Sequence, residues 1–204
     1  MRKVCPLIPK GFTLLELLIT VGIFALIGTT ALVGLVKTQD QFAFRNATKG
    51  SANIIREVRS FAMGNKTIES VPPSTSGELP YQYGAYIDLA GNKITTFGDK
   101  NDAGKNKFDL STDATFDTFE LDAGYKYEVY DENLKATNQG NITLFYKPTN
   151  ADFHIAQEGV PQLTGRYVAI RIYDTKNISR ESYIVLFTLS GNPETFNSLT
   201  DVTN

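Results

Sequence analysis

Cysteine and histidine are nearly absent from this 204-residue chain, which has one of each. Cys5 has no partner, so the chain cannot close a disulfide within itself, and its stability must come from packing or a bound metal. His154, in the strand-like stretch 152–155, is expected to be a half-buried or surface side chain. The sequence has no paired metal-binding histidines, no G-x-S-x-G motif and no phosphate-binding glycine loop. It therefore predicts a protein that is not an enzyme, with calcium, considered below, as the one candidate cofactor.

An excess of basic residues is also missing. The chain has 20 lysines and arginines against 22 aspartates and glutamates. A protein with this balance has no general attraction for nucleic acid or for anionic lipid. Nucleic acid is therefore not expected as a general partner.

Charged residues are scarce between Phe12 and Val36, and proline is absent over a longer stretch. Glu16 is the only charged residue between Phe12 and Val36, and no proline occurs between Lys10 and Pro72. A helix over residues 12–36 would reach about 37 Å at 1.5 Å per residue, which is enough to cross a hydrocarbon core of roughly 30 Å. The run therefore predicts a membrane-spanning helix.

Three other interpretations of this run remain open. A secretory signal peptide has an apolar region of roughly 7–15 residues and a cleavage site after it, whereas this run is longer and lacks such a site. A plain anchor leaves Glu16 unexplained, because an acidic side chain in the membrane costs about 2.5–3.5 kcal/mol. A buried helix of a soluble protein would need apolar cover on every side.

The residues around the start of the run form a recognisable motif. Lys10-Gly11-Phe12-Thr13-Leu14-Leu15-Glu16 resembles the prepilin processing signal of type IV pilins and type II secretion pseudopilins. The resemblance implies that a prepilin peptidase cuts between Gly11 and Phe12, that Phe12 is then N-methylated, and that Glu16 guides assembly. It also implies a structural filament subunit, with other pilin or pseudopilin subunits, the peptidase/methylase and an inner-membrane assembly platform as partners.

Charge around the span predicts its orientation. Arg2, Lys3 and Lys10 precede the span and only Lys37 directly follows it, which favours an amino terminus on the cytoplasmic side. We expect a single-pass protein of the inner membrane whose remaining residues face outward and enter an extracytoplasmic filament. Removing residues 1–11 leaves 17 basic against 22 acidic residues, a net charge of −5. The processed chain has no cysteine, so it lacks the disulfide loop of many major pilins, and Val33 stands near the place of their frequent mid-span proline.

The helix is expected to continue beyond the membrane. Ile54, Ile55, Val58, Phe61 and Ala62 recur at helical spacing, and Gly64-Asn65 is a stop signal. The predicted organisation is a removed leader at 1–11, an assembly helix at 12–36, an amphipathic half of the same helix at 37–64, and a β-rich head at 65–204.

Beyond a loop-like Pro-Ser-Gly stretch at 71–80, the pattern changes to alternation typical of strands. We predict an α+β fold in which one mostly antiparallel sheet covers the outer half of the helix. The order of helix and strands, with Gly191 after the last hairpin, resembles the H-type minor pseudopilins. The expected strands are 83–89, 93–97, 115–121, 125–130, 141–146, 152–156, 167–174 and 183–189.

One loop carries oxygen ligands at spacings that suit calcium. Asp99, Asn101, Asp102 and Asp109 surround Gly104, as in loops that wrap a hard cation. Ala103 stands where a third ligand belongs, and three lysines oppose cation binding. A solvated turn and a calcium loop both remain open.

A second candidate surface lies near the carboxyl end. Tyr167, Arg171 and Tyr173 fall on one face of a predicted strand, and Lys176 and Arg180 follow in the turn. Aromatic side chains interleaved with cations can bind single-stranded nucleic acid. A minor, tip-located pilin that binds DNA or another ligand is therefore the alternative to a purely structural subunit.

Overall fold

A computed structural model describes residues 12–68, 79–100, 108–132, 140–148, 152–157 and 165–202. The chain divides into two compact units, Met1–Ala43 and Phe44–Asn204. Each is described by itself below.

A single long helix, α1, runs from Leu14 to Gly64. It is uninterrupted because no proline occurs within it. It ends as the sequence predicts: Asn65 takes a left-handed conformation with φ 49°, and the Lys66 N–H donates to the Phe61 carbonyl at 3.1 Å. This is the hydrogen bond of a Schellman cap, with asparagine in the position that glycine usually occupies.

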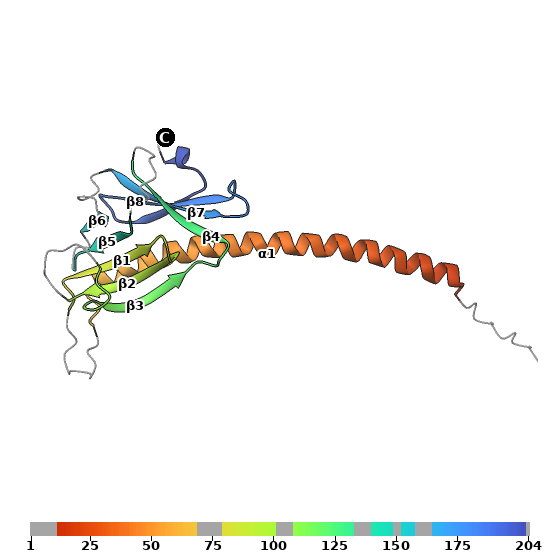
Figure 1. Cartoon of the computed structure of the whole chain (residues 1–204), viewed down its shortest axis with the longest axis horizontal. Helices are drawn as coiled ribbons and strands as arrows, with labels where there is room; N and C mark the ends of the chain where they lie inside the picture. The colour runs from red at the N-terminus through yellow and green to blue at the C-terminus, as the bar shows by residue number, and fades with distance from the viewer. Residues whose placement is uncertain are drawn as a thin grey trace, which may run out of the picture. The chain divides into compact units, whose positions relative to one another are not determined.

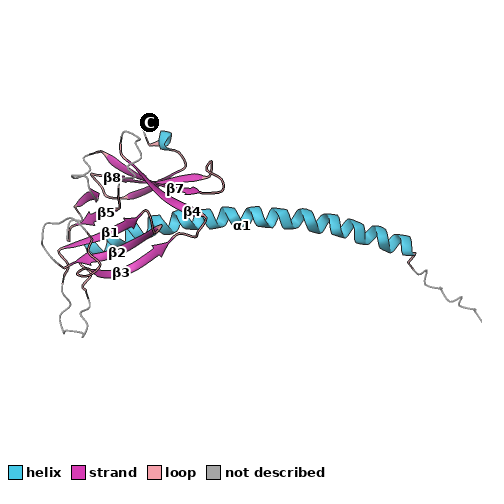
Figure 2. Cartoon of the chain, in the orientation of Figure 1, coloured by secondary structure: helices cyan, strands magenta, loops and turns pink. Residues whose placement is uncertain are grey.

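The first sheet has the strand order β3-β2-β1-β5-β6, and every neighbouring pair is antiparallel. A tight turn joins β1 to β2, in which Asp88 Oδ1 accepts from the Gly91 N–H at 2.8 Å and Asn92 has φ 51°. Figure 2 shows these strands beside the carboxyl-terminal half of α1. The strands are β1 (Gln82–Asp88), β2 (Lys93–Asp99), β3 (Ala114–Glu120), β5 (Ile142–Tyr146) and β6 (Phe153–Gln157).

The second sheet has the order β4-β7-β8-β9, again antiparallel throughout. The sequence predicted one sheet, and the described residues form two, with α1, β1–β3 and β7–β8 visible in Figure 1. The strand β9 was not predicted, because it is short and begins with a proline. The proline is tolerated because β9 lies at the edge of the sheet, where a missing N–H breaks no hydrogen bond between strands. The strands are β4 (Tyr125–Tyr130), β7 (Tyr167–Asp174), β8 (Glu181–Phe187) and β9 (Pro193–Phe196).

The core of the second unit lies between the sheets and the end of α1. Ile55, Val58 and Ala62 are fully buried on one face of the helix, as their helical spacing predicts. Ser51 and Tyr127 also meet there through their hydroxyls at 2.7 Å. The amphipathic half of α1 therefore supplies the face on which the β-strands pack, and the predicted α+β fold is confirmed.

The second sheet is buried on both faces. Val168, Ile170 and Ile172 are buried on one face of β7, and Tyr167 and Ala169 on the other belong to a separate cluster. The carboxyl-terminal segment, with the short 3-10 helix η1 (Leu199–Asp201), covers that second face. The cluster consists of Tyr167, Ala169, Tyr183 and Val185, with Tyr130, Phe187, Phe196, Leu199 and Val202 packed against it.

Candidate functional site

Thr13 caps the amino-terminal end of α1. Its hydroxyl oxygen accepts from the Glu16 N–H at 3.2 Å, and its carbonyl accepts from the Leu17 N–H at 3.2 Å. Thr-x-x-Glu is the spacing of a capping box, a signal that the sequence carried in addition to the family motif. Thr13 therefore has a structural role of its own, because it satisfies a helix N–H that would otherwise be unpaired.

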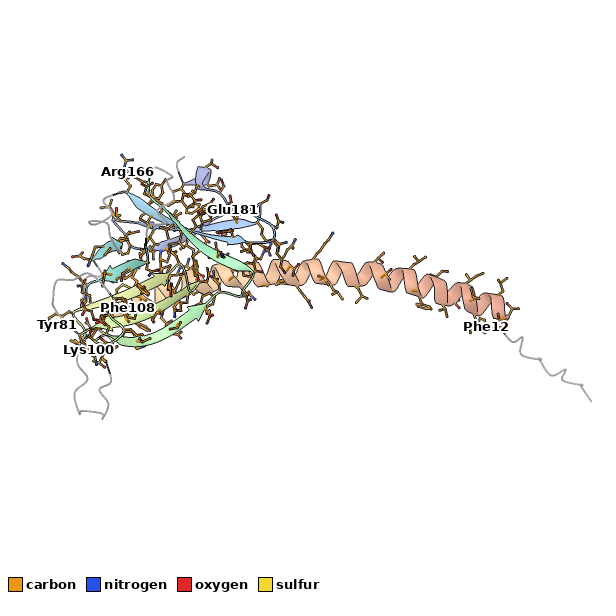
Figure 3. The ribbon with its side chains drawn as sticks, in the orientation of Figure 1. Phe12, Tyr81, Lys100, Phe108, Arg166 and Glu181 are labelled. Atoms are coloured by element: carbon orange, nitrogen blue, oxygen red, sulfur yellow. The ribbon has the colours of Figure 1, made fainter. Side chains whose placement is uncertain are left out.

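The first unit exposes an almost continuous apolar surface. Every described side chain from Phe12 to Val36 is exposed, and Phe12 is 80% exposed at the end of α1 (Figure 3). The most apolar 18-residue window has a mean hydropathy of 2.3, and none of it is buried within the protein. By length and composition, this part of α1 can cross a membrane.

The hydroxyl groups on this surface are satisfied within the helix. Thr20 donates to the carbonyls of Glu16 and Leu17, each at 2.9 Å, and Thr29 donates to the Leu26 carbonyl at 2.9 Å. Such bonds lower the cost of placing a polar side chain in hydrocarbon. They leave Glu16 as the one strongly polar side chain of this surface.

Glu16 lies in the first turn of α1, where a negative charge interacts favourably with the helix dipole. No described residue forms an ion pair with its carboxylate. Cleavage after Gly11, which lies outside the described residues, would create an α-amine on Phe12, four positions from Glu16. Amine and carboxylate would then be the two charges of an otherwise apolar helix end.

The structure brings together the aromatic and basic residues of the second candidate surface only in part. Tyr167, Arg171 and Tyr173 lie on the same face of β7, where Tyr167 is 8% exposed within the cluster described above. Lys176 is exposed in the turn after β7. Arg180 contacts Asp174, with 3.4 Å between Nη1 and Oδ2.

Arg171 is held between two carboxylates. Its Nη1 lies 2.9 Å from Glu128 Oε2 on β4, and its Nε lies 2.8 Å from Glu181 Oε2 on β8. Its guanidinium also lies 4.8 Å from the centre of the Tyr173 ring. Burial alone would lower the pKa of Arg171, but its hydrogen bonds to both glutamates outweigh this effect and raise the pKa. Arg171 therefore joins three strands of the second sheet, and nucleic-acid binding here stays a prediction.

Two ligands of the proposed calcium loop lie outside the described residues, namely Asn101 and Asp102. Asp99 ends β2 and is 8% exposed, and the backbone N–H of Asp109 donates to Asp113 Oδ2 at 2.7 Å. Burial raises the pKa of Asp113, and the nearby charges of Asp99 and Asp109 raise it further. Asp113 is thus a third carboxylate at this place, which the loop pattern missed because it follows the pattern's last position. Among the described residues no group of three or more potential ligands has the geometry of a metal site, so calcium stays a prediction.

His154 lies in β6 and is partly buried. Its ring stacks on Phe145 with 5.0 Å between centroids and 13° between planes. Burial lowers the pKa of His154, and the positive charge of Lys147 lowers it further. The histidine therefore has a packing role in the first sheet, in keeping with the position expected from its strand-like sequence.

Comparison with known proteins finds a family match in the amino-terminal segment. Residues 9–32 match the family model of the prokaryotic N-terminal methylation motif. No curated protein matches the chain, and no solved structure matches it. The match covers Gly11, Phe12, Thr13 and Glu16 and all but the last four residues of the exposed apolar run 12–36, and it supports a membrane-anchored, pilin- or pseudopilin-like subunit. The chain therefore carries the prepilin-type signal of type IV pilins and pseudopilins.

Proposed function

We propose that this protein is a structural subunit, a pilin or pseudopilin, of a type IV pilus or of a type II secretion-type filament. The observation that carries the proposal is the coincidence of the methylation motif with the apolar run 12–36, whose described side chains are all exposed. An exposed surface of this kind requires a lipid or protein environment. A bilayer before assembly and neighbouring helices after assembly would supply both.

Glu16 would favour transfer of the subunit from the bilayer to the filament. In the bilayer its carboxylate is costly to bury, whereas in a filament it can pair with the α-amine of Phe12 from an adjacent subunit. Association is then favoured in the register that brings these two charges together. Prepilin peptidase and the methylase act first, because the amine does not exist before the Gly11–Phe12 bond is cut.

The basic residues before the span and the single Lys37 directly after it support an amino terminus on the cytoplasmic side. The second unit then lies outside the inner membrane, where an assembly platform could incorporate the subunit. The alternative of a tip-located subunit that binds DNA has less support, because Arg171 and Arg180 are both engaged with carboxylates.

Processing provides the direct test. Mass spectrometry of the protein from assembled filaments should show a chain that begins at N-methylated Phe12. Gly11→Ala should leave the full-length precursor in the membrane, because a side chain at this position obstructs the peptidase. An intact Met1 terminus in assembled filaments would overturn the proposal.

A further inference from the structure

The carboxyl-terminal half of α1 leaves one face exposed, and an uncharged stripe runs along the middle of this face. Asn46, Asn53 and Ser60 are exposed and follow one another at seven-residue intervals, so they share one side of the helix. All three are uncharged. The residues on the two flanks of this stripe are charged, with opposite sign.

The first flank is basic and faces β9. Arg45, Lys49 and Arg56 lie on one side of α1, since four and seven residues separate them. Arg56 Nη2 donates to the Pro193 carbonyl of β9 at 3.0 Å. Beside them is a pocket of about 360 Å³, lined by Phe44, Arg45, Thr48, Lys49, Ser182, Thr195 and Asn197.

The cations that line this pocket suit a carboxylate. Thr48 and Ser182 are buried, but each hydroxyl already donates its one proton to a backbone carbonyl at 3.1 Å, so neither is a donor for the anion. Arg45 and Lys49 are exposed and make no ion pair or hydrogen bond with any described residue. Two unpaired cations four residues apart on a helix can bind the same anionic group.

The second flank is covered by β3. The Phe119 ring lies against Gly50 so closely that a Cβ there would overlap it. Phe116 packs edge-on against Phe61 of α1, with 5.3 Å between ring centroids. Gly50 and Phe61 lie about 100–120° around the helix from Lys49, across the uncharged stripe. Figure 1 shows β3 below α1 and the strands β7 and β8 above it.

This flank is acidic. Asp117, Glu120 and Asp122 are exposed on β3 and just after it. Neither Glu120 nor Asp122 forms an ion pair with a described residue. Lys93 is opposite Glu120 in the strand register, but its amine lies 3.9 Å from Asp88.

We propose that the basic pocket receives the acidic end of β3, at Glu120 and Asp122, from a second copy of this chain. Processed copies carry a net charge of −5, so they repel one another unless opposite patches meet. Because the two patches are different surfaces of one molecule, the contact is head-to-tail and can continue as an open array. The inference rests on the proposed filament function and assigns the lateral contact between its subunits.

Cysteine cross-linking tests the contact in the full chain. In a Cys5→Ser background, Lys49→Cys and Glu120→Cys on one chain should give a ladder of oxidised multimers from filaments. Either single variant should give none, whereas co-expressed single variants should give one cross-linked dimer. Dimers from a single variant, or no cross-link in filaments that form normally, would overturn the proposal.

Charge reversal tests the energetics of the contact. Arg45→Glu with Lys49→Glu should reduce filament number by about tenfold or more, since like charges then meet. Adding Glu120→Lys and Asp122→Lys to that chain should restore filaments, because the attraction returns with exchanged signs. Arg166→Glu, at an exposed cation elsewhere on the head (Figure 3), is the control and should have no effect.

The outcomes separate the two proposals. If the wild-type chain is absent from every filament, the proposed function fails. If filaments form and are insensitive to reversal, the lateral contact fails and the function stands. If reversal lowers only the binding of the chain to anionic vesicles, the pocket binds a lipid headgroup and the inference is wrong.

Discussion

Glu16 places a carboxylate on a helix surface that is otherwise apolar. The hydroxyls of Thr20 and Thr29 donate to backbone carbonyls of the helix. No described residue donates a hydrogen bond to the Glu16 carboxylate. Its burial in hydrocarbon costs about 2.5–3.5 kcal/mol. On the proposed function, an isolated subunit bears this cost, and the α-amine of a processed neighbour would offset it.

Glu16→Gln should therefore leave insertion and cleavage intact and impair assembly. Glutamine keeps the shape and a hydrogen bond but removes the attraction to the α-amine. Filaments should be counted by electron microscopy in a strain in which this subunit carries assembly. Glu194→Gln, the same change at an exposed position of β9, serves as the control. Normal filament numbers with Glu16→Gln would return residues 12–36 to the plain-anchor interpretation.

The individual residues differ in how well sequence could predict them. Gly11, Phe12 and Glu16 are identified by spacing along the chain, which needs no tertiary structure, and the family match covers all three. Asp113 could not be found from the loop pattern, because it follows the pattern's last position. Asp109 meets it through a local turn, whereas Asp99 comes near it only after β2 and β3 have paired.

Among the elements, alternation of apolar and polar residues predicted β1–β8 closely, and β4 and β7 have the predicted bounds. The sheet order was not predictable in the same way. The pairings of β1 with β5 and of β4 with β7 join segments far apart in sequence, and no local pattern specifies them. The partition into two sheets follows from these distant pairings, as does the position of Arg171 between Glu128 and Glu181.

Arg171→Met should destabilise the second sheet. The substitution keeps most of the side-chain volume but leaves two carboxylates, 19% and 30% exposed, without their shared cation. Because both carboxylates are partly solvated, the free energy of unfolding should fall by about 2 kcal/mol, which is less than the cost of breaking a fully buried ion pair. Urea unfolding of the chain in detergent would measure it as a lower midpoint with an unchanged m-value.

The control for Arg171→Met is the triple variant that also carries Glu128→Gln and Glu181→Gln. Removing all three charges should recover part of the lost stability, because no uncompensated charge then remains. A triple variant less stable than the single variant would show that the glutamates stabilise the sheet independently of Arg171.

At the scale of the whole molecule, the two units have opposite solvent requirements. The first unit is exposed and apolar along the membrane-spanning run, whereas the second buries its apolar residues in its own core. The amphipathic half of α1 belongs to that core through Ile55, Val58 and Ala62. A fragment that keeps this half and lacks the span therefore retains every contact that holds the head together.

A fragment beginning at Lys37 should consequently be folded, soluble and monomeric. The lateral contact proposed above is too weak to hold free heads together, because exposed ion pairs contribute about 0–1 kcal/mol each. The contact gains strength only when assembled helices hold the heads close together. Circular dichroism and sedimentation would measure fold and mass.

The same fragment tests the predicted calcium loop. If the loop with Asp99, Asn101, Asp102 and Asp109 binds calcium, the melting temperature should be higher in calcium than in chelator, since a ligand that binds only the folded state stabilises it. Asp113→Asn should raise the melting temperature in chelator near pH 7. Because the pKa of Asp113 is raised in the folded protein, its charged form lowers the stability of the fold at pH values above the ordinary pKa of an aspartate. Asparagine carries no charge and avoids this loss of stability. Equal melting temperatures in calcium and chelator would exclude the metal site, and an aggregated fragment would show that the head depends on a partner to fold.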